Sequence, residues 1–424
     1  MTELNQQLNI KMKLFFIIFT SPVRKAICRF LSTMMVCFFI ISLHAQSNPE
    51  FRGVWVATVD NIDWPTKGDF NSNSQKAAFI KLLDMHQRNG INALVMQIRP
   101  CTDAFYPSPY EPWSQWLTGV QGKPPSPYYD PLAFMISETH KRGMVFHAWM
   151  NPYRAEFNLS TPSLSATHIT KVHPEWFLIY GDKRYFDPGN KEAQRYVTQV
   201  VADVVKRYEV DAIHFDDYFY PYRIAGKEFP DDASFKKYGL GLTKDDWRRS
   251  NTDSVISMLS VAIKKERKTC QFGISPFGVW RNQDKDPIDG SKTIGAQTNY
   301  DDLFANILLW LKKSWIDYVA PQLYWEIGHR IAPYEVLLAW WGNHTYGKHC
   351  YIGMGIYRAN SNAAWKELSQ LPRQIVSMRN TPNMKGMIFF SSKTFEKNPN
   401  GWSDSLRLDY CRVPVKVPPM EWLK

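Results

Sequence analysis

The chain has 424 residues, 44% of them hydrophobic, and a formal net charge of +11. It contains no low-complexity tract, which indicates a globular rather than a disordered protein. Its basic residues form no block interleaved with aromatic residues, so we expect no nucleic-acid partner, although a mild basic bias suits an anionic polymer.

Residues 1–45 are predicted to be a signal peptide rather than part of the fold. Basic residues come first, the apolar run Leu31–Leu43 follows, and the small residue Ala45 stands where cleavage is expected. The apolar run is shorter than the ~20 residues that a membrane span needs. We therefore expect export to the periplasm or cell envelope, with no stable membrane insertion after cleavage. An uncleaved N-terminal anchor is the alternative, and translation that begins at Met12 also stays open.

From residue 46 to residue 410, apolar strand-like runs alternate with segments of helical spacing. In one such segment Val197, Val201 and Val204 fall on a single helix face. The alternation predicts an α/β fold, a (β/α)8 TIM barrel with long, aromatic-rich loops, followed by a C-terminal tail at 411–424. A doubly wound open sheet is the alternative. The expected strands lie at 51–59, 92–99, 144–152, 211–217, 271–278, 317–325, 350–357 and 386–392, and the expected helices at 75–90, 130–143, 190–210, 251–266, 300–315 and 362–380.

The connections that follow the expected strands are long, whereas those that precede them are short. The long connections carry most of the Trp, Tyr and Pro residues. In a barrel, the loops after the strands build the active-site face. The long connections are 100–130, 151–190, 218–250 and 279–300.

The sequence indicates no metal site and no cofactor. The four cysteines beyond the predicted signal peptide are far apart and lack the C-x-x-C spacing of zinc sites, so we expect buried free thiols. Neither an H-E-x-x-H motif nor a Gly-rich phosphate loop is present. A metal between His147 and His214, on neighbouring strands, stays as an alternative.

The stretch "DAIHFDDYFYP" at 211–221 places two acids at the end of an expected strand. Side chains alternate across a strand, so Ile213 and Phe215 should face the helices and His214 and Asp216 the barrel interior. Asp216 then lies near the mouth of the barrel. Asp217 has the opposite parity and reaches the pocket only if the strand has already turned; otherwise it caps the next segment or binds an Arg.

Polar and aromatic side chains also stand at the ends of other expected strands. Burying several such groups is costly unless they face each other or a ligand. Sugar rings present apolar faces that stack on aromatic rings and hydroxyls that need polar partners, so the set indicates carbohydrate binding. The expected substrate-binding residues are Arg99, Asp103, His147, Trp149, Asn151, Tyr153, Arg154, His214, Tyr218, Trp280, Gln322, Tyr324 and Trp325.

Glycoside hydrolysis normally needs two carboxyl groups, one that donates a proton and one that serves the anomeric carbon. The candidates are Asp216, Asp217 and Glu326, with Glu175 and Asp187 as weaker ones. A Ser/His/Asp hydrolase is not indicated, because the chain has no G-x-S-x-G motif.

Six motifs in this order resemble the glycosyl hydrolase-like 10 family: "FRGVWVATVDNIDWP", "GMVFHAWMNPYR", "DAIHFDDYFYP", "FGISPFGVWRN", "YVAPQLYW" and "YIGMGIY". The resemblance covers about residues 51–395. It implies a (β/α)8 barrel that cleaves glycan strands of peptidoglycan, notably strands without stem peptides. It implies that Asp216 and Asp217 are the active-site acids, and that His147, Asn151, Arg154 and Arg281 have roles in the pocket. An acid at the position of Glu326 is not universal in the family, which weakens that candidate.

We therefore expect an exported glycoside hydrolase whose partner is a polysaccharide, the glycan of peptidoglycan. Asp216 is expected to serve the anomeric centre, and Asp217 or Glu326 to donate the proton. If the sugar carries an N-acetyl group, its carbonyl could attack instead, with Asp216 polarising the amide. The alternatives are a glycosidase acting on another polysaccharide, such as an α-glucan, and a non-catalytic glycan-binding barrel.

Overall fold

The computed structural model describes residues 48–160 and 164–423, so the predicted signal peptide lies outside the described residues. From Pro49 onward the chain forms one unit built on a closed barrel of parallel strands. Each strand pairs in parallel with its neighbours, and β9, which lies beside β8, also pairs with β11. This pairing closes the sheet. The (β/α)8 barrel is confirmed, and the open sheet is wrong.

All eight expected strand positions are occupied. The sixth is interrupted at Pro321, which has no N–H to donate to the ladder, and is therefore divided into β9 and β10. The strands are β1 (Phe51–Val56), β2 (Ala93–Arg99), β3 (Val145–Met150), β7 (Ala212–Phe215), β8 (Gln271–Ile274), β9 (Tyr318–Val319), β10 (Gln322–Leu323), β11 (His349–Met354) and β12 (Met384–Phe389).

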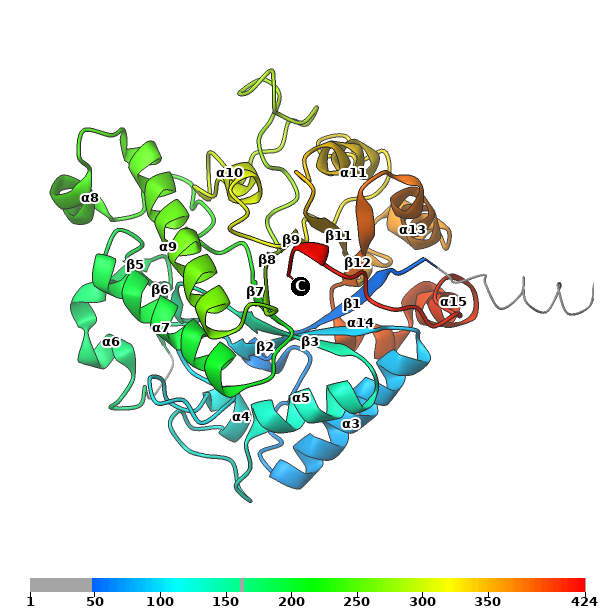
Figure 1. The fold of residues 1–424 in the computed structure, drawn as a ribbon, viewed down its shortest axis with the longest axis horizontal. Helices are drawn as coiled ribbons and strands as arrows, with labels where there is room; N and C mark the ends of the chain where they lie inside the picture. Colours follow the sequence, from blue (N-terminus) through cyan, green and yellow to red (C-terminus); the bar gives the residue numbers. More distant parts are fainter. Residues whose placement is uncertain (1–47, 161–163, 424) are drawn as a thin grey trace, which may run out of the picture. The chain divides into compact units, whose positions relative to one another are not determined.

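Helices surround the strands (Figure 1). Side-chain caps explain where several begin: the Asn71 side chain accepts hydrogen bonds from the first turn of α3, and the Asn190 side chain does so for α7. The pattern missed α11, whose sequence "YEVLLAWWGN" is apolar on most of its surface and so shows little periodicity. None of the helices in the described part of the chain has the length and hydropathy of a membrane span. The main helices are α3 (Ser72–Arg88), α5 (Pro131–Lys141), α7 (Lys191–Arg207), α9 (Lys244–Glu266), α10 (Ile307–Lys312), α11 (Tyr334–Asn343) and α13 (Gln370–Asn380).

The predicted alternation of side chains is present in the packing. Ile213 and Phe215 on β7 belong to the apolar layer between strands and helices, whereas Ala212 belongs to the barrel interior. Gly273 on β8 makes room for the interior ring of Tyr318, because a Cβ there would lie 1.9 Å from Cζ of Tyr318.

The long connection after β3 contains structure that the sequence pattern did not predict. It forms a small antiparallel sheet of β4 (Arg154–Glu156), β5 (Phe177–Tyr180) and β6 (Lys183–Phe186), with β6 in the middle. The connection after β7 carries the short helix α8 (Asp232–Tyr238). Both additions follow the ends of strands and extend the barrel on that side.

The C-terminal tail covers the other end of the barrel, where the strands start (Figure 1). Met420 packs inside the barrel with Phe51, the first residue of β1. The backbone N–H of Glu50 donates to the carbonyl of Lys416 at 3.0 Å. The indole N–H of Trp422 donates to Asp317 at 3.0 Å, just before β9. The tail therefore closes the barrel at the strand starts and leaves the opposite end as the mouth.

Candidate active site

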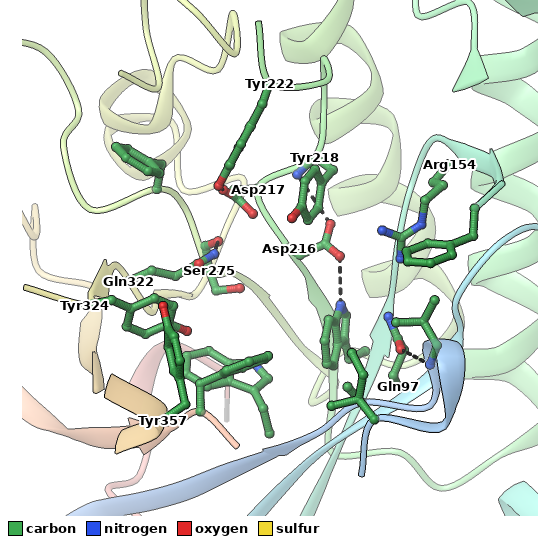
Figure 2. A pocket seen from close by; sticks show the side chains of 18 of the residues that line it. Gln97, Arg154, Asp216, Asp217, Tyr218, Tyr222, Ser275, Gln322, Tyr324 and Tyr357 are labelled. Carbon is green, nitrogen blue, oxygen red and sulfur yellow. Dashed lines mark hydrogen bonds between the residues drawn. The ribbon is translucent and has the colours of Figure 1, made fainter. Parts of the chain in front are cut away.

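A cavity of about 460 Å³ lies at the mouth of the barrel, where the strands end. Figure 2 shows Asp216 and Asp217 next to each other in it, with Arg154 on one side and Tyr324 and Tyr357 on the other. Most of its remaining wall is aromatic. The lining residues are Trp55, Ala57, Val59, Ile62, Gln97, Trp149, Arg154, Phe157, Asp216, Asp217, Tyr218, Tyr222, Ser275, Phe277, Gln322, Tyr324, Trp325, Tyr357, Arg358 and Phe390.

Asp216 is held in place by several hydrogen-bond donors. The indole N–H of Trp149 donates to Oδ2 at 3.0 Å, and the Asn151 amide donates to both carboxylate oxygens at 3.0 and 3.1 Å. Burial raises the pKa of Asp216, while the charge of Arg154 and these hydrogen bonds oppose the rise. Trp149 and Asn151 come from β3 and its end, the neighbour of β7, so the two strands together orient this carboxylate.

Asp217 has fewer compensating partners. The strand ends at Phe215, so the chain has turned by Asp217 and both acids line the same cavity despite their opposite parity. The hydroxyl of Tyr222 donates to Oδ2 of Asp217. Burial and the neighbouring charge of Asp216 raise the pKa of Asp217 to about 7, against opposing hydrogen bonds from Tyr222 and Gln322. Asp217 therefore keeps its proton in a pH range where ordinary carboxyl groups have lost theirs.

Arg154 places a positive charge beside Asp216. Its guanidinium lies 5.6 Å from the ring centroid of Tyr218 and 5.4 Å from that of Phe157, and its Nε and Nη2 donate to the carbonyl of Pro100. No carboxylate in the described ranges pairs with it at ion-pair distance. Its charge is thus directed at the cavity and at Asp216.

Aromatic rings form two opposite walls of the cavity. On one side the rings of Tyr218 and Tyr222 stack with centroids 5.2 Å apart. On the other, Tyr324 meets the ring of Tyr357 edge to face at 5.6 Å. Flat apolar walls with carboxyl groups between them suit a sugar ring, whose apolar faces stack and whose hydroxyls need polar partners.

A polar layer in the barrel interior lies below the cavity. Trp55, which lines the cavity, donates its indole N–H to Nε2 of His214 at 3.2 Å, so Nδ1 of His214 carries the proton and donates to Oη of Tyr318 at 2.9 Å. The Tyr318 hydroxyl in turn donates to Nδ1 of His147 at 2.8 Å. Burial lowers the pKa of His147 to about 4 and also lowers the pKa of His214 well below its usual value, so both rings are neutral. Both Nδ1 atoms bind the same hydroxyl, and the described residues contain no cluster of three or more possible metal ligands.

The structure brings together only part of the expected site. Eight of the expected residues line the cavity: Trp149, Arg154, Asp216, Asp217, Tyr218, Gln322, Tyr324 and Trp325. Asn151 contacts Asp216 from behind the wall, and His147 and His214 lie in the interior layer. Their roles in binding and catalysis remain predictions.

The other expected residues lie outside the cavity lining. Arg99 binds Glu111 in a buried ion pair, and Asp103, whose pKa burial raises to about 7, accepts from the amide of Gln121. Tyr153 is fully buried, Trp280 stacks on Trp340, and Arg281 pairs with Asp301 at 3.0 Å.

The remaining acids expected as catalytic candidates also lie outside the cavity lining. Glu326 accepts hydrogen bonds from Asn362 and Trp365. The weaker candidates Glu175 and Asp187 bind His173 and Ser234 instead.

Several lining residues were missed because they resemble core residues in the sequence. Trp55 and Phe390 belong to apolar runs at the first and last strands, and Phe277 and Ser275 follow β8. Gln97 carried a usable signal, since it faces inward on the same side of its strand as Arg99. Its Oε1 accepts from the backbone N–H groups of Thr58 and Val59, which orients the side chain at the cavity wall.

Comparison with known proteins agrees with this geometry. A family model described as glycosyl hydrolase-like 10 matches residues 50–368. The chain belongs to the glycosyl hydrolase-like 10 family. This glycosyl hydrolase-like 10 protein is 47% identical over 411 residues to glycosyl hydrolase YngK of Bacillus subtilis. The alignment covers 94% of this chain and 80% of YngK. It is 37% identical over 378 residues to glycosyl hydrolase DigH of Escherichia coli K12, covering 83% of this chain and 85% of that protein.

Solved structures share the fold of this family member at low identity. The catalytic domain of β-amylase from Paenibacillus polymyxa aligns with a TM-score of 0.55 at 10% identity, covering 87% of this chain and 99% of that one. An α-L-fucosidase from Paenibacillus thiaminolyticus aligns with a TM-score of 0.52 at 11% identity, covering 84% of this chain and 49% of that one. The expected family is confirmed, and the protein is a glycoside hydrolase, so the non-catalytic barrel is set aside.

Proposed function

We propose that this glycoside hydrolase is exported and cleaves the glycan strands of peptidoglycan, with Asp216 and Asp217 as its catalytic pair. The observation that carries the chemistry is the contrast between two adjacent carboxyl groups in one aromatic-walled cavity. Asp216 is surrounded by donors and a positive charge, whereas Asp217 faces a negative charge. The substrate and the export rest on the predicted signal peptide and on what the family resemblance implies.

The environments of the two acids assign their roles. Hydrogen bonds from Trp149 and Asn151 and the charge of Arg154 favour the ionised form of Asp216, so the single proton that the pair holds near neutral pH belongs on Asp217. Protonated Asp217 donates to the glycosidic oxygen of the leaving sugar. The Tyr222 hydroxyl donates to Oδ2 of Asp217, which leaves Oδ1 to carry that proton.

Asp216 acts on the other side of the bond. As a carboxylate it stabilises the positive charge that grows on the anomeric carbon in the oxocarbenium-like transition state. It does so by direct attack, or by polarising the amide of an N-acetyl group whose carbonyl oxygen attacks. The second route suits peptidoglycan, because both of its sugars carry N-acetyl groups.

The first experiment compares wild type with Asp216→Asn on purified glycan strands, with and without stem peptides. The assay measures release of reducing ends and the masses of the products. We expect wild type to release reducing ends and Asp216→Asn to lose about 10²–10⁴-fold in kcat, because removing a preorganised charge at a developing cation has effects of this size. Near-normal turnover by Asp216→Asn would contradict the assigned mechanism. Release from an α-glucan but from no peptidoglycan strand would contradict the substrate.

A further inference from the structure

Arg358 is a charged residue of the cavity that the proposed mechanism does not use. It ends the short 3₁₀ turn η3 (Ile356–Arg358) that follows β11. Around the barrel, β11 is separated from β7 by β8 and by the interrupted strand of β9 and β10. Arg358 thus enters the cavity from a different side than the two catalytic acids.

The charges that line the cavity are Arg154, Asp216, Asp217 and Arg358. Arg154 acts on Asp216. Within residues 48–160 and 164–423, no carboxylate lies at ion-pair distance from Arg358, and its buried Nε has no hydrogen-bond partner. The hydroxyl of Tyr357 is its polar neighbour. A guanidinium N–H that is shielded from water and has no acceptor is costly, so this position favours an acceptor supplied by a ligand.

Two other arginines in connections that follow strands are neutralised by the protein itself. Arg223 pairs with Asp302 at 3.0 Å, and Arg281 pairs with Asp301 at 3.0 Å. Both come from connections that follow strands, as Arg358 does. Arg358 differs from these two residues, because it lines the cavity and no carboxylate of the described residues lies at ion-pair distance from it.

We propose that Arg358 binds a carboxylate carried by the substrate and thereby selects glycan strands whose muramic acid lactyl groups are free. This proposal rests on the proposed function. In peptidoglycan the stem peptide is joined to the lactyl carboxyl by an amide bond, so a strand with stem peptides has no charge there, and a strand without them has a carboxylate on every second sugar. A guanidinium recognises a carboxylate through two parallel hydrogen bonds, which an amide cannot match.

The neighbourhood of Arg358 fits a sugar that carries such a group. Tyr357, which is 48% exposed, lines the cavity together with Arg358. The ring can cover the apolar face of the sugar while Arg358 binds the carboxylate. Arg358 is accordingly a specificity-determining residue, separate from the acids that break the bond.

The test compares two forms of one substrate: stem-free glycan strands, and the same strands with their lactyl carboxyls converted to neutral methylamides. Wild type, Arg358→Gln, Arg358→Lys and Arg330→Gln are assayed for kcat/KM on both. Arg330→Gln is the matched control, because it removes the same charge from an exposed position in the loop after β10 that does not line the cavity.

We expect wild type to prefer the carboxylate form, and Arg358→Gln to lose about 10–100-fold on that form alone, which is the size of a charged hydrogen-bond pair. Arg358→Lys should keep part of the preference, and Arg330→Gln should keep all of it. The proposal is overturned if wild type cleaves both forms equally well, a result that needs no variant, or if Arg358→Gln slows both forms equally. Failure of the proposed function looks different, because wild type would then release reducing ends from neither form.

Discussion

The two ends of the barrel use the same strands but cover the interior in opposite ways. At the strand starts, the C-terminal tail inserts Met420 among interior rings such as Phe51, and Trp422 donates a hydrogen bond to Asp317, whose charge is paired with Lys264. At the strand ends, the interior opens into a cavity that contains Asp216 and Asp217. The comparison shows that the tail closes one end over apolar interior rings, whereas the other end opens into a cavity that contains two carboxyl groups.

The energetics of the two ends have opposite signs. Burying Met420 stabilises the fold, whereas burying Asp217 destabilises its ionised form. The change in the pKa of Asp217 from 3.8 to about 7 corresponds to a cost on the order of 4 kcal/mol for ionising it inside the protein. Substitutions at the mouth should therefore act mainly on kcat, and substitutions at the closed end should act mainly on the free energy of unfolding.

The largest expected effect is at the mouth, in Asp217→Asn. This variant removes the proposed proton donor, so we expect kcat to fall by about 10²–10⁴-fold. Wild-type kcat should fall as the pH rises above about 7, because the proposed mechanism requires Asp217 in its protonated form, and the variant should lack this decline. The measurement is kcat from about pH 5 to about pH 9. A variant that keeps the decline would assign the titration to another group.

Asp217→Asn should be more stable than wild type at alkaline pH. The pKa of Asp217 is higher in the folded than in the unfolded state, so the wild-type free energy of unfolding should decrease as the pH rises from about 4 to about 7, and the Asn side chain removes that contribution. Urea denaturation of both proteins at acidic and alkaline pH measures this difference.

An intermediate effect is expected at the closed end, in Met420→Ala. The truncation leaves a cavity in the barrel interior, and we expect a loss of about 2–4 kcal/mol in the free energy of unfolding. The folded fraction should keep its wild-type kcat, because Met420 lies at the end away from the acids. Val413→Ala, in an exposed part of the same tail, is the control and should change little. A loss of kcat without a loss of stability would refute the separation of the two ends.

The smallest effect is expected for Glu326→Gln. Both carboxylate oxygens of Glu326 are engaged by Asn362 and Trp365, so the substitution should cost about 1 kcal/mol of stability and leave kcat nearly unchanged. It is the matched comparison for Asp217→Asn, since each exchanges one carboxylate for its amide. A loss of kcat as large as that of Asp217→Asn would make Glu326 the proton donor.

Much of the fold could be read from periodic patterns. All eight strand positions and the faces of β7 were predicted, because alternation along a strand is a local property that burial on one side imposes. Helix α11 was missed because it is buried on most sides, so its apolar residues do not recur at the helical period. The small sheet in the connection after β3 was missed because its strands are only three or four residues long.

Within the site, the alternation of side chains along a strand predicted which residues face the barrel interior, but not how far from the mouth of the barrel each one lies. His147 and Trp149 share one face of β3, yet His147 joins the interior layer and Trp149 lines the cavity. Two residues along a strand amount to about 6.6 Å, which is enough to separate a core group from a lining group. Arg99 faces inward by the same rule, but Glu111 from the following loop pairs with it.

The sequence by itself determined the barrel, the pair of acids at the end of β7 and the aromatic character of the mouth, because each follows from the order of residues along one segment. Only the tertiary structure decided that Asp217 joins Asp216 in one cavity, that Glu326 is held by Asn362 and Trp365, and that no carboxylate in the described part of the chain pairs with Arg358. These outcomes depend on which loops meet after the barrel closes. Distances between segments far apart in the chain are set by packing, and no local pattern encodes them.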